Sequence, residues 1–363
     1  MIPISAWVSI LLAFAPRREG PIVQQSLRPL KAVSTELEPT SLIPDKKINS
    51  KFPVRTVVEN AQKIYKNLSM ESDGICKWYS STIKFCYVQP PDELHLETEH
   101  DSDSVYEYVA DSHDKTKPLL VYLPGLDGVG ISAIAQFTDL SQTFELWRMY
   151  INPKDDRSTF TELTTTVAQF IHEAAIKLNR QVIVVGESFG GLLAPSVALR
   201  VQSKHPLAIQ GLILVNPATS FDQTLWSTLG PFLATLRHLE DEETEKNGSF
   251  TPYSVMGGMT LSAVIPDATQ FRKIISLLTG MSITSVDDVN ELLSIMRDGF
   301  GILADQLPAT VVEHRVSQWL PVGSMFVNPR LSSVNVTTVV IAGENDNMLP
   351  VSLNFNVMYT KVQ

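Results

Sequence analysis

The stretch Val182-Ile183-Val184-Val185-Gly186-Glu187-Ser188-Phe189-Gly190-Gly191 is a β-branched run that ends in Gly-x-Ser-x-Gly and continues into a helix-like pattern. We predict a strand, a sharp turn and a helix here. Such a turn exposes the serine hydroxyl above a sheet, while the motif's two glycines keep the neighbouring backbone free of Cβ clashes. The motif also occurs by chance in Gly-rich turns, so the flanking strand and helix give it its specificity. Ser188 is therefore the candidate nucleophile.

A second glycine-rich segment follows another apolar run. Pro118 to Leu123 has the pattern of a buried strand, and it leads into Pro124-Gly125-Leu126-Asp127-Gly128-Val129-Gly130. In an α/β-hydrolase the loop after the third strand supplies one oxyanion-hole amide, and the residue after the nucleophile supplies the other. We assign these amides to Leu126 and Phe189. A phosphate-binding loop is the competing interpretation, but no Lys-Ser/Thr pair follows and the spacing fits neither nucleotide fingerprint.

The strands around the serine alternate with helical patterns. Phe144 to Ile151 and Gly211 to Pro217 are predicted as strands, and a helix begins within residues 156–160. Strands separated by helical patterns of ten or more residues imply a parallel sheet. The sequence thus predicts an α/β fold of the α/β-hydrolase kind, with a mostly parallel sheet flanked by helices.

The last clear strand, Val336 to Ala342, is followed by the candidate triad acid. We assign Asp346 to this role, with Glu344 as a second choice, because the chain order in this fold is serine, acid, histidine. The expected histidine does not follow: all seven histidines precede Asp346, so the triad histidine is not present in this chain. We expect a hydrolase part that is incomplete at its C-terminus. A substitute histidine, His314 or His238, and a natural pseudoenzyme are the alternatives.

Composition limits the classes of function. The chain has 363 residues, 44% of them hydrophobic, and a formal net charge of −10, which is sufficient for a sizeable core and disfavours binding to nucleic acid. Neither a metal site nor a cofactor site is indicated. Cys76 and Cys86 are interpreted as ordinary thiols that could pair if oxidised. Since no apolar run reaches the roughly 20 residues of a membrane-spanning helix, any membrane or lipid-droplet contact would be peripheral.

The N-terminal part looks like a presequence. Apolar Ile4 to Ala15 precedes two arginines and a stretch rich in Ser, Thr and Pro that ends near Lys51. Ala13-Phe14-Ala15-Pro16 resembles the cleavage motif of bipartite presequences of plastid proteins from algae with secondary plastids, and this resemblance implies a plastid location. The alternative is a buried N-terminal strand or helix.

Four motifs occur together in order: Leu-Pro-Gly-Leu-Asp-Gly, Asp-Arg-Ser-Thr-Phe, Val-Gly-Glu-Ser-Phe-Gly-Gly and Leu-Val-Asn-Pro-Ala-Thr-Ser-Phe. Their order and spacing resemble the plant phytyl ester synthase family, in which an α/β-hydrolase is fused to a diacylglycerol-acyltransferase-like domain. The resemblance covers roughly residues 117–350. It implies an esterase or acyltransferase of plastid lipid metabolism, with an acyl-lipid or acyl-thioester donor and phytol or diacylglycerol as acceptor.

We divide the chain accordingly. Residues 1–51 are the presequence and a disordered segment, and residues 52–117 hold an amphipathic helix (Val54 to Leu68) and an irregular acidic segment. Residues 118–220 and 331–363 form the hydrolase core, and residues 221–330 form a helical cap whose apolar faces suit an acyl chain. The rival function is a catalytically inactive, hydrolase-like protein that binds a lipid or a partner.

Overall fold

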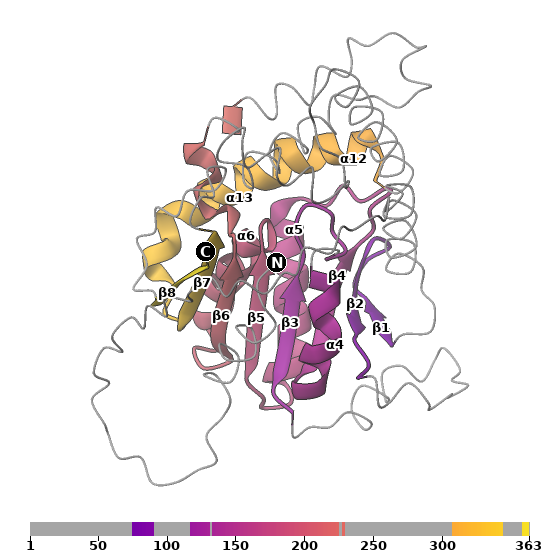
Figure 1. Cartoon of the computed structure of the whole chain (residues 1–363), viewed down its shortest axis with the longest axis vertical. Coiled ribbons are helices and arrows are strands. Elements are labelled where there is room, and N and C mark those ends of the chain that lie inside the picture. Colours follow the sequence, from indigo (N-terminus) through magenta and orange to yellow (C-terminus); the bar gives the residue numbers. More distant parts are fainter. Residues whose placement is uncertain are drawn as a thin grey trace, which may run out of the picture.

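An eight-stranded, mostly parallel sheet forms the centre of the computed structural model, which describes residues 75–90, 117–130, 133–224, 227–228, 307–343 and 358–362 (Figure 1). Its strands lie in the order β1-β2-β4-β3-β5-β6-β7-β8. They are β1 (Cys76–Trp78), β2 (Ile83–Tyr87), β3 (Leu119–Leu123), β4 (Glu145–Ile151), β5 (Val182–Glu187), β6 (Ile209–Val215), β7 (Thr338–Gly343) and β8 (Met358–Val362). Only the pairs β1·β2 and β2·β4 are antiparallel. The predicted parallel sheet is confirmed.

Helices cover both faces of the sheet (Figure 1). Ile183 and Val185 of β5 pack in one cluster with α4 (Ile134–Thr143), whereas Val182 and Val184 pack in the other cluster with α5 (Phe160–Ile171) and α6 (Gly190–Gln202). Successive side chains of a strand point to opposite faces. A strand buried on both faces therefore carries a continuous apolar run, as this one does from Val182 to Val185.

A second group of helices lies at the C-terminal end of the predicted cap (221–330). It comprises α12 (Ala309–His314), a π-helical segment (Arg315–Trp319), α13 (Leu320–Val327) and a 3-10 segment (Asn328–Ser333). Short helical pieces also follow α5 (His172–Ile176) and β6 (Ala218–Gln223). Val316, Trp319 and Leu320 join the same core cluster as α5 and α6. The end of the predicted cap thus packs on the hydrolase core.

The start of α5 is fixed by the sequence that precedes it. The Thr159 side chain accepts a hydrogen bond from the Glu162 amide, and the Glu162 carboxylate accepts one from the Thr159 amide. This capping box satisfies two amides that the first helical turn leaves without partners. Just before it, the buried carboxylate of Asp156 accepts hydrogen bonds from the hydroxyls of Thr82 and Ser158 at 2.6 and 2.7 Å.

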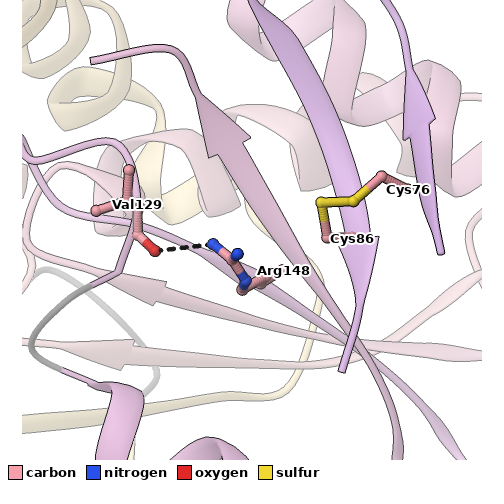
Figure 2. The surroundings of a disulfide bond; sticks show 4 residues. All are labelled: Cys76, Cys86, Val129 and Arg148. Carbon is pink, nitrogen blue, oxygen red and sulfur yellow. Dashed lines mark hydrogen bonds between the residues drawn. A yellow bond between two sulfur atoms is a disulfide. The ribbon is translucent and has the colours of Figure 1, made fainter. Parts of the chain in front are cut away.

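The antiparallel hairpin of β1 and β2 was not predicted, and it corrects the interpretation of the cysteines. Cys76 lies directly opposite Cys86 in the hairpin, and the two form a disulfide (Figure 2). Directly opposed residues of an antiparallel pair bring their Cβ atoms close enough for such a bridge. The interpretation as ordinary thiols was therefore wrong, because the strand pairing that aligns them was not foreseen.

Glu173 ties this hairpin to the helical layer. Its carboxylate accepts hydrogen bonds from the Lys77 ammonium and from the Tyr79 hydroxyl, the latter at 2.8 Å. Partial burial raises the pKa of Glu173, but hydrogen bonds from Lys77, Tyr79 and Gln169 and the Lys77 charge outweigh it, so the net pKa is lowered. A lowered folded-state pKa contributes stability that is present above the unfolded pKa and is lost as the pH falls through the folded pKa.

We expect Glu173→Gln to lower the free energy of unfolding at pH 7 by roughly 0.5 kcal/mol, a small value because the group is partly solvent-screened. The difference from the unsubstituted chain should vanish near pH 3. Urea unfolding at the two pH values measures it, with the exposed Asp155 changed to Asn as the control. An equal loss at both pH values would contradict the electrostatic account.

Several expectations fall on residues outside the described ranges. These are the presequence (1–51), the helix at Val54 to Leu68 and most of the cap (221–330), and they stay predictions. Within the described part of the chain, no helix is both long and apolar enough to cross a membrane.

Candidate active site

Ser188 occupies the turn between β5 and α6, as predicted. Its φ is 50°, a left-handed conformation that costs a non-glycine residue on the order of 1 to 2 kcal/mol. Hydrogen bonds on both sides hold the turn: the Ser188 amide donates to Val215 O at 2.9 Å, and Ser188 O accepts from the amides of Gly191 and Ala218, both at 3.0 Å. The surrounding backbone therefore fixes a strained serine at the carboxyl edge of the sheet, where open α/β sheets bind their ligands.

The glycines around Ser188 are required by close packing. A Cβ on Gly186 would lie 2.2 Å from Gly190 O, and a Cβ on Gly190 would lie 2.1 Å from Leu123 O. A Cβ on Gly191 would lie 2.5 Å from the Cβ of Pro217. These distances are far below van der Waals contact, so the helix after the serine approaches the sheet only because all three positions lack a side chain.

The loop after β3 lies against the turn. β3 and β5 are neighbours, with Leu123 opposite Gly186, so the loops that follow the two strands meet at one edge. A Cβ on Gly125 would lie 3.6 Å from the Ser188 Cβ. Within this loop the Gly128 amide donates to Gly125 O at 3.1 Å, and Gly128 has a φ of 75°. The structure thus brings the predicted loop to the predicted nucleophile.

The two candidate oxyanion amides are Leu126 N and Phe189 N. Within the described residues, neither amide donates a hydrogen bond to another group of the protein. Most buried backbone amides are paired, and Phe189 is fully buried. Two unpaired amides on the loops flanking Ser188 are what the stabilisation of an oxyanion requires. The assignment of Leu126 and Phe189 stays a prediction that this geometry supports.

The Phe189 side chain fixes the turn to the core. Its ring stacks on Trp319 with a centroid distance of 4.6 Å and an interplanar angle of 19°, and it meets Phe160 edge-on at 6.1 Å. Burial of an aromatic side chain with such ring contacts contributes a few kcal/mol to stability. Phe189 is therefore held by its side chain, while its backbone amide donates no hydrogen bond within the described residues.

The acid and the base of the predicted triad are not placed. Asp346 and the second choice, Glu344, lie outside the described residues, although β7 ends three residues before Asp346 at the same edge of the sheet as Ser188. His238 is also outside. Among the described histidines, none hydrogen-bonds Ser188; His314 pairs through its Nε2 with Ser158 O at 3.2 Å. The proposal that His314 replaces the base receives no support from this contact.

Two arginines next to the Leu126 loop were missed. Arg148 lies inside the buried strand β4, and its guanidinium donates to Val129 O at 3.3 Å (Figure 2). Burial lowers the pKa of Arg148, which the nearby Tyr150 and Asp127 partly oppose. Arg315 donates to Leu126 O at 2.7 Å. A charged residue inside an otherwise apolar strand was the available signal for Arg148.

A surface pocket lies at the other edge of the sheet. Its lining includes Lys117, Arg180, Lys204 and His205, at the amino ends of β3, β5 and β6. Ser188 and the Leu126 loop lie at the carboxyl ends of these strands. Since the unpaired amides and the strained serine are at that carboxyl edge, we do not assign this pocket to the candidate active site.

A mostly parallel, helix-flanked sheet with a strained serine at its strand-to-helix turn defines an α/β-hydrolase, and a family model described as the α/β hydrolase fold matches residues 153–244. Phytyl ester synthase 1 of Arabidopsis thaliana, a chloroplastic protein, is 32% identical over 240 residues, which are 64% of this chain and 31% of the relative. Phytyl ester synthase 2 of the same plant, also chloroplastic, is 37% identical over 120 residues, 33% of this chain and 16% of the relative. Over this region the chain is similar to the two phytyl ester synthases, and its fold is that of an α/β-hydrolase.

The matched region spans less than a third of the length of either relative. A crystal structure of MGS-M2, an α/β hydrolase enzyme from a deep-sea metagenome library of the Medee basin, is similar at 14% identity with a TM-score of 0.47, covering 69% of this chain and 82% of that chain. The fold assignment rests on the sheet and the helical layers described above, and not on that likeness.

Proposed function

We propose that the protein is a serine acyl-transfer enzyme that forms or cleaves fatty acyl esters through an acyl-Ser188 intermediate. Ser188 Oγ bonds to the carbonyl carbon of an ester or thioester donor and passes its proton to a histidine base that Asp346 orients. The amides of Leu126 and Phe189 stabilise the oxyanion. When the intermediate collapses, the bond to the donor's alcohol or thiol breaks, and that group leaves with the proton.

The acceptor completes the reaction. Water gives a free fatty acid, whereas the hydroxyl of phytol or diacylglycerol attacks the acyl ester, loses its proton to the base and gives a new ester. The names of the two Arabidopsis relatives support phytol as an acceptor and a plastid location. Peripheral contact with a membrane or a lipid droplet follows from the chemistry of these substrates, because long hydrocarbon chains are held in lipid phases.

The observation that carries this proposal is the backbone of Ser188. A non-glycine residue in the left-handed region persists only where surrounding structure holds it, and such strain clusters at functional sites. Here the strained residue carries a hydroxyl group. The loops on either side of it hold the amides of Leu126 and Phe189, which have no partner in the described part of the chain. A serine with a purely structural role in a tight turn would need neither the strain nor the free amides.

Product analysis tests the proposal. The protein, extended beyond Gln363 by the histidine-bearing segment of a relative, is incubated with a galactolipid or an acyl thioester, each with phytol, with diacylglycerol or with no added acceptor, and the lipids are identified by mass spectrometry. We expect phytyl ester or triacylglycerol in addition to free fatty acid, and none of these with Ser188→Ala. Binding of the lipids without any Ser188-dependent product would instead favour the inactive lipid-binding function.

A further inference from the structure

We infer that Arg315 and Trp319 form a clamp that positions both candidate oxyanion residues, with Arg315 as a positioning residue for the Leu126 amide. The two side chains come from one π-helical segment, Arg315–Trp319, on the C-terminal side of the predicted cap. The inference rests on the proposed function, because a positioned oxyanion hole matters only to an acyl-transfer enzyme. Arg315 follows Leu126 by 189 positions along the chain.

Arg315 binds the loop directly. Its side chain is 1% exposed, and its Nη1 donates to Leu126 O at 2.7 Å while its Nη2 donates to Asn152 O at 3.1 Å. Hydrogen bonds from a charged donor are stronger than those between neutral groups, and a planar guanidinium fixes the direction of both bonds. Arg315 therefore joins the loop after β3 to the end of β4 through two backbone carbonyls.

The loop itself is built to admit this arginine. A Cβ on Gly128 would lie 2.8 Å from Nη1 of Arg315 and 2.9 Å from Ile151 O, so only glycine fits beside the guanidinium. The Ile151 amide donates to Gly128 O at 2.8 Å. The Leu126 carbonyl is thus bound to Arg315, and a hydrogen bond between Gly125 and Gly128 closes the turn around it. The Leu126 amide has no partner within the described residues.

Trp319 connects the same segment to the turn of the nucleophile. Its ring stacks on Phe189, its Nε1 donates to Ser158 O at 2.7 Å, and the Arg315 guanidinium lies 4.5 Å from the ring centroid. A cation over an aromatic face is attracted by the quadrupole of the ring. Arg315 thus holds the backbone of one candidate oxyanion residue, while Trp319 holds the side chain of the other.

The local helix geometry fits a functional role for the pair. A π-helical turn is less regular than an α-helical one and occurs frequently at functional sites. The segment Arg315–Trp319 begins with the arginine and ends with the tryptophan, so the departure from α-helical geometry falls on the residues that touch the two loops. A clamp in this place would also transmit the position of the cap to the oxyanion hole.

The test compares Arg315→Lys and Arg315→Met with a matched control, Arg180→Met. Arg180 is also mostly buried, donates to Lys117 O at 3.1 Å and pairs with Glu145 at 2.7 Å, but it lies at the amino edge of the sheet. Two readouts are taken on the whole chain: amide hydrogen exchange of Gly128, Val129 and Ile151, and the rate at which a fluorophosphonate probe labels Ser188. Where turnover is measurable, kcat and KM are determined as well.

We expect faster exchange at the three amides and labelling slowed about 10- to 100-fold in Arg315→Met, less than the full loss of an oxyanion donor, which is about 100- to 1,000-fold. KM should change little and kcat should fall, because the loss appears in the transition state. Arg315→Lys should show exchange and labelling rates between those of the unsubstituted protein and Arg315→Met, since an ammonium reaches one carbonyl but not both. Arg180→Met should lose stability without either change at the site.

Unchanged exchange at these amides in folded Arg315→Lys overturns the clamp, and so does unchanged labelling in variants whose loop exchanges faster. If Arg315→Met does not fold, Arg315→Lys decides, because its ammonium keeps a charged donor at the site. If neither the unsubstituted protein nor a version extended beyond Gln363 by a histidine-bearing segment of a relative is labelled at Ser188, the proposed function fails, and the exchange arm alone supports or overturns the clamp.

Discussion

Ser188→Ala is expected to reduce the hydrolysis of a chromogenic acyl ester by about 1,000-fold or more, because the members of a catalytic triad act as a unit and loss of one removes most of their effect. The substitution keeps the Cβ and the φ of 50°, so the fold should stay intact. Initial rates are measured for the 363-residue chain and for a version extended beyond Gln363 by a histidine-bearing segment of a relative.

Ser203→Ala, at the exposed end of α6, is the control and should leave the rate unchanged. We expect the extension to raise the rate by several orders of magnitude, since the acid is followed by the histidine in this fold. Fast, Ser188-dependent hydrolysis by the 363-residue chain would contradict that expectation and would favour His314 or His238 as the base. Hydrolysis that persists in Ser188→Ala would reject Ser188 as the nucleophile.

The second large effect is expected from Gly190→Ala. The added Cβ would lie 2.1 Å from Leu123 O and 2.9 Å from Pro124 O, so α6 must move away from β3. Backbone atoms cannot rotate aside as a flexible side chain does, and we expect a loss of about 4 kcal/mol or more in the free energy of unfolding. In a domain of this size that corresponds to a fall of about 10 °C in Tm.

Gly125→Ala is the matched control, because its Cβ would meet its nearest neighbours, Asp127 Oδ1 and Ser188 Cβ, at 3.4 and 3.6 Å. It should fold with a Tm within a few degrees of the unsubstituted protein, although its methyl group would sit beside the candidate nucleophile. Thermal unfolding followed by circular dichroism distinguishes the two. A Gly190→Ala protein as stable as Gly125→Ala would show that the helix is not packed as tightly as described.

The centre of the fold was predictable because its signals are local. A continuous apolar run followed by glycines marks β5 and its turn, and Thr159 with Glu162 three residues later marks the start of α5. Helical patterns between strands then imply the parallel pairing. Ser188, Leu126 and Phe189 could be proposed for the same reason, since each lies within three residues of the end of a strand.

The parts that were missed depend on contacts distant in sequence. β1 has three residues, one of them charged, and β2 contains a lysine that is buried because its ammonium lies between the rings of Trp78 and Tyr150, at 4.7 and 4.8 Å from their centroids. Neither strand shows the alternation by which strands are predicted. Arg315 reads as a surface residue in the sequence, and only the fold reveals that its partners are the carbonyls of Leu126 and Asn152.

The central claim, that Ser188 is an activated nucleophile, is tested most directly by mapping the adduct of a fluorophosphonate probe. The 363-residue chain and its extended version are treated, digested and analysed by mass spectrometry. The account predicts a single adduct on the peptide that contains Ser188, formed faster in the extended version and absent from Ser188→Ala. No adduct on this peptide in either version, or an adduct that persists elsewhere in Ser188→Ala, would contradict it.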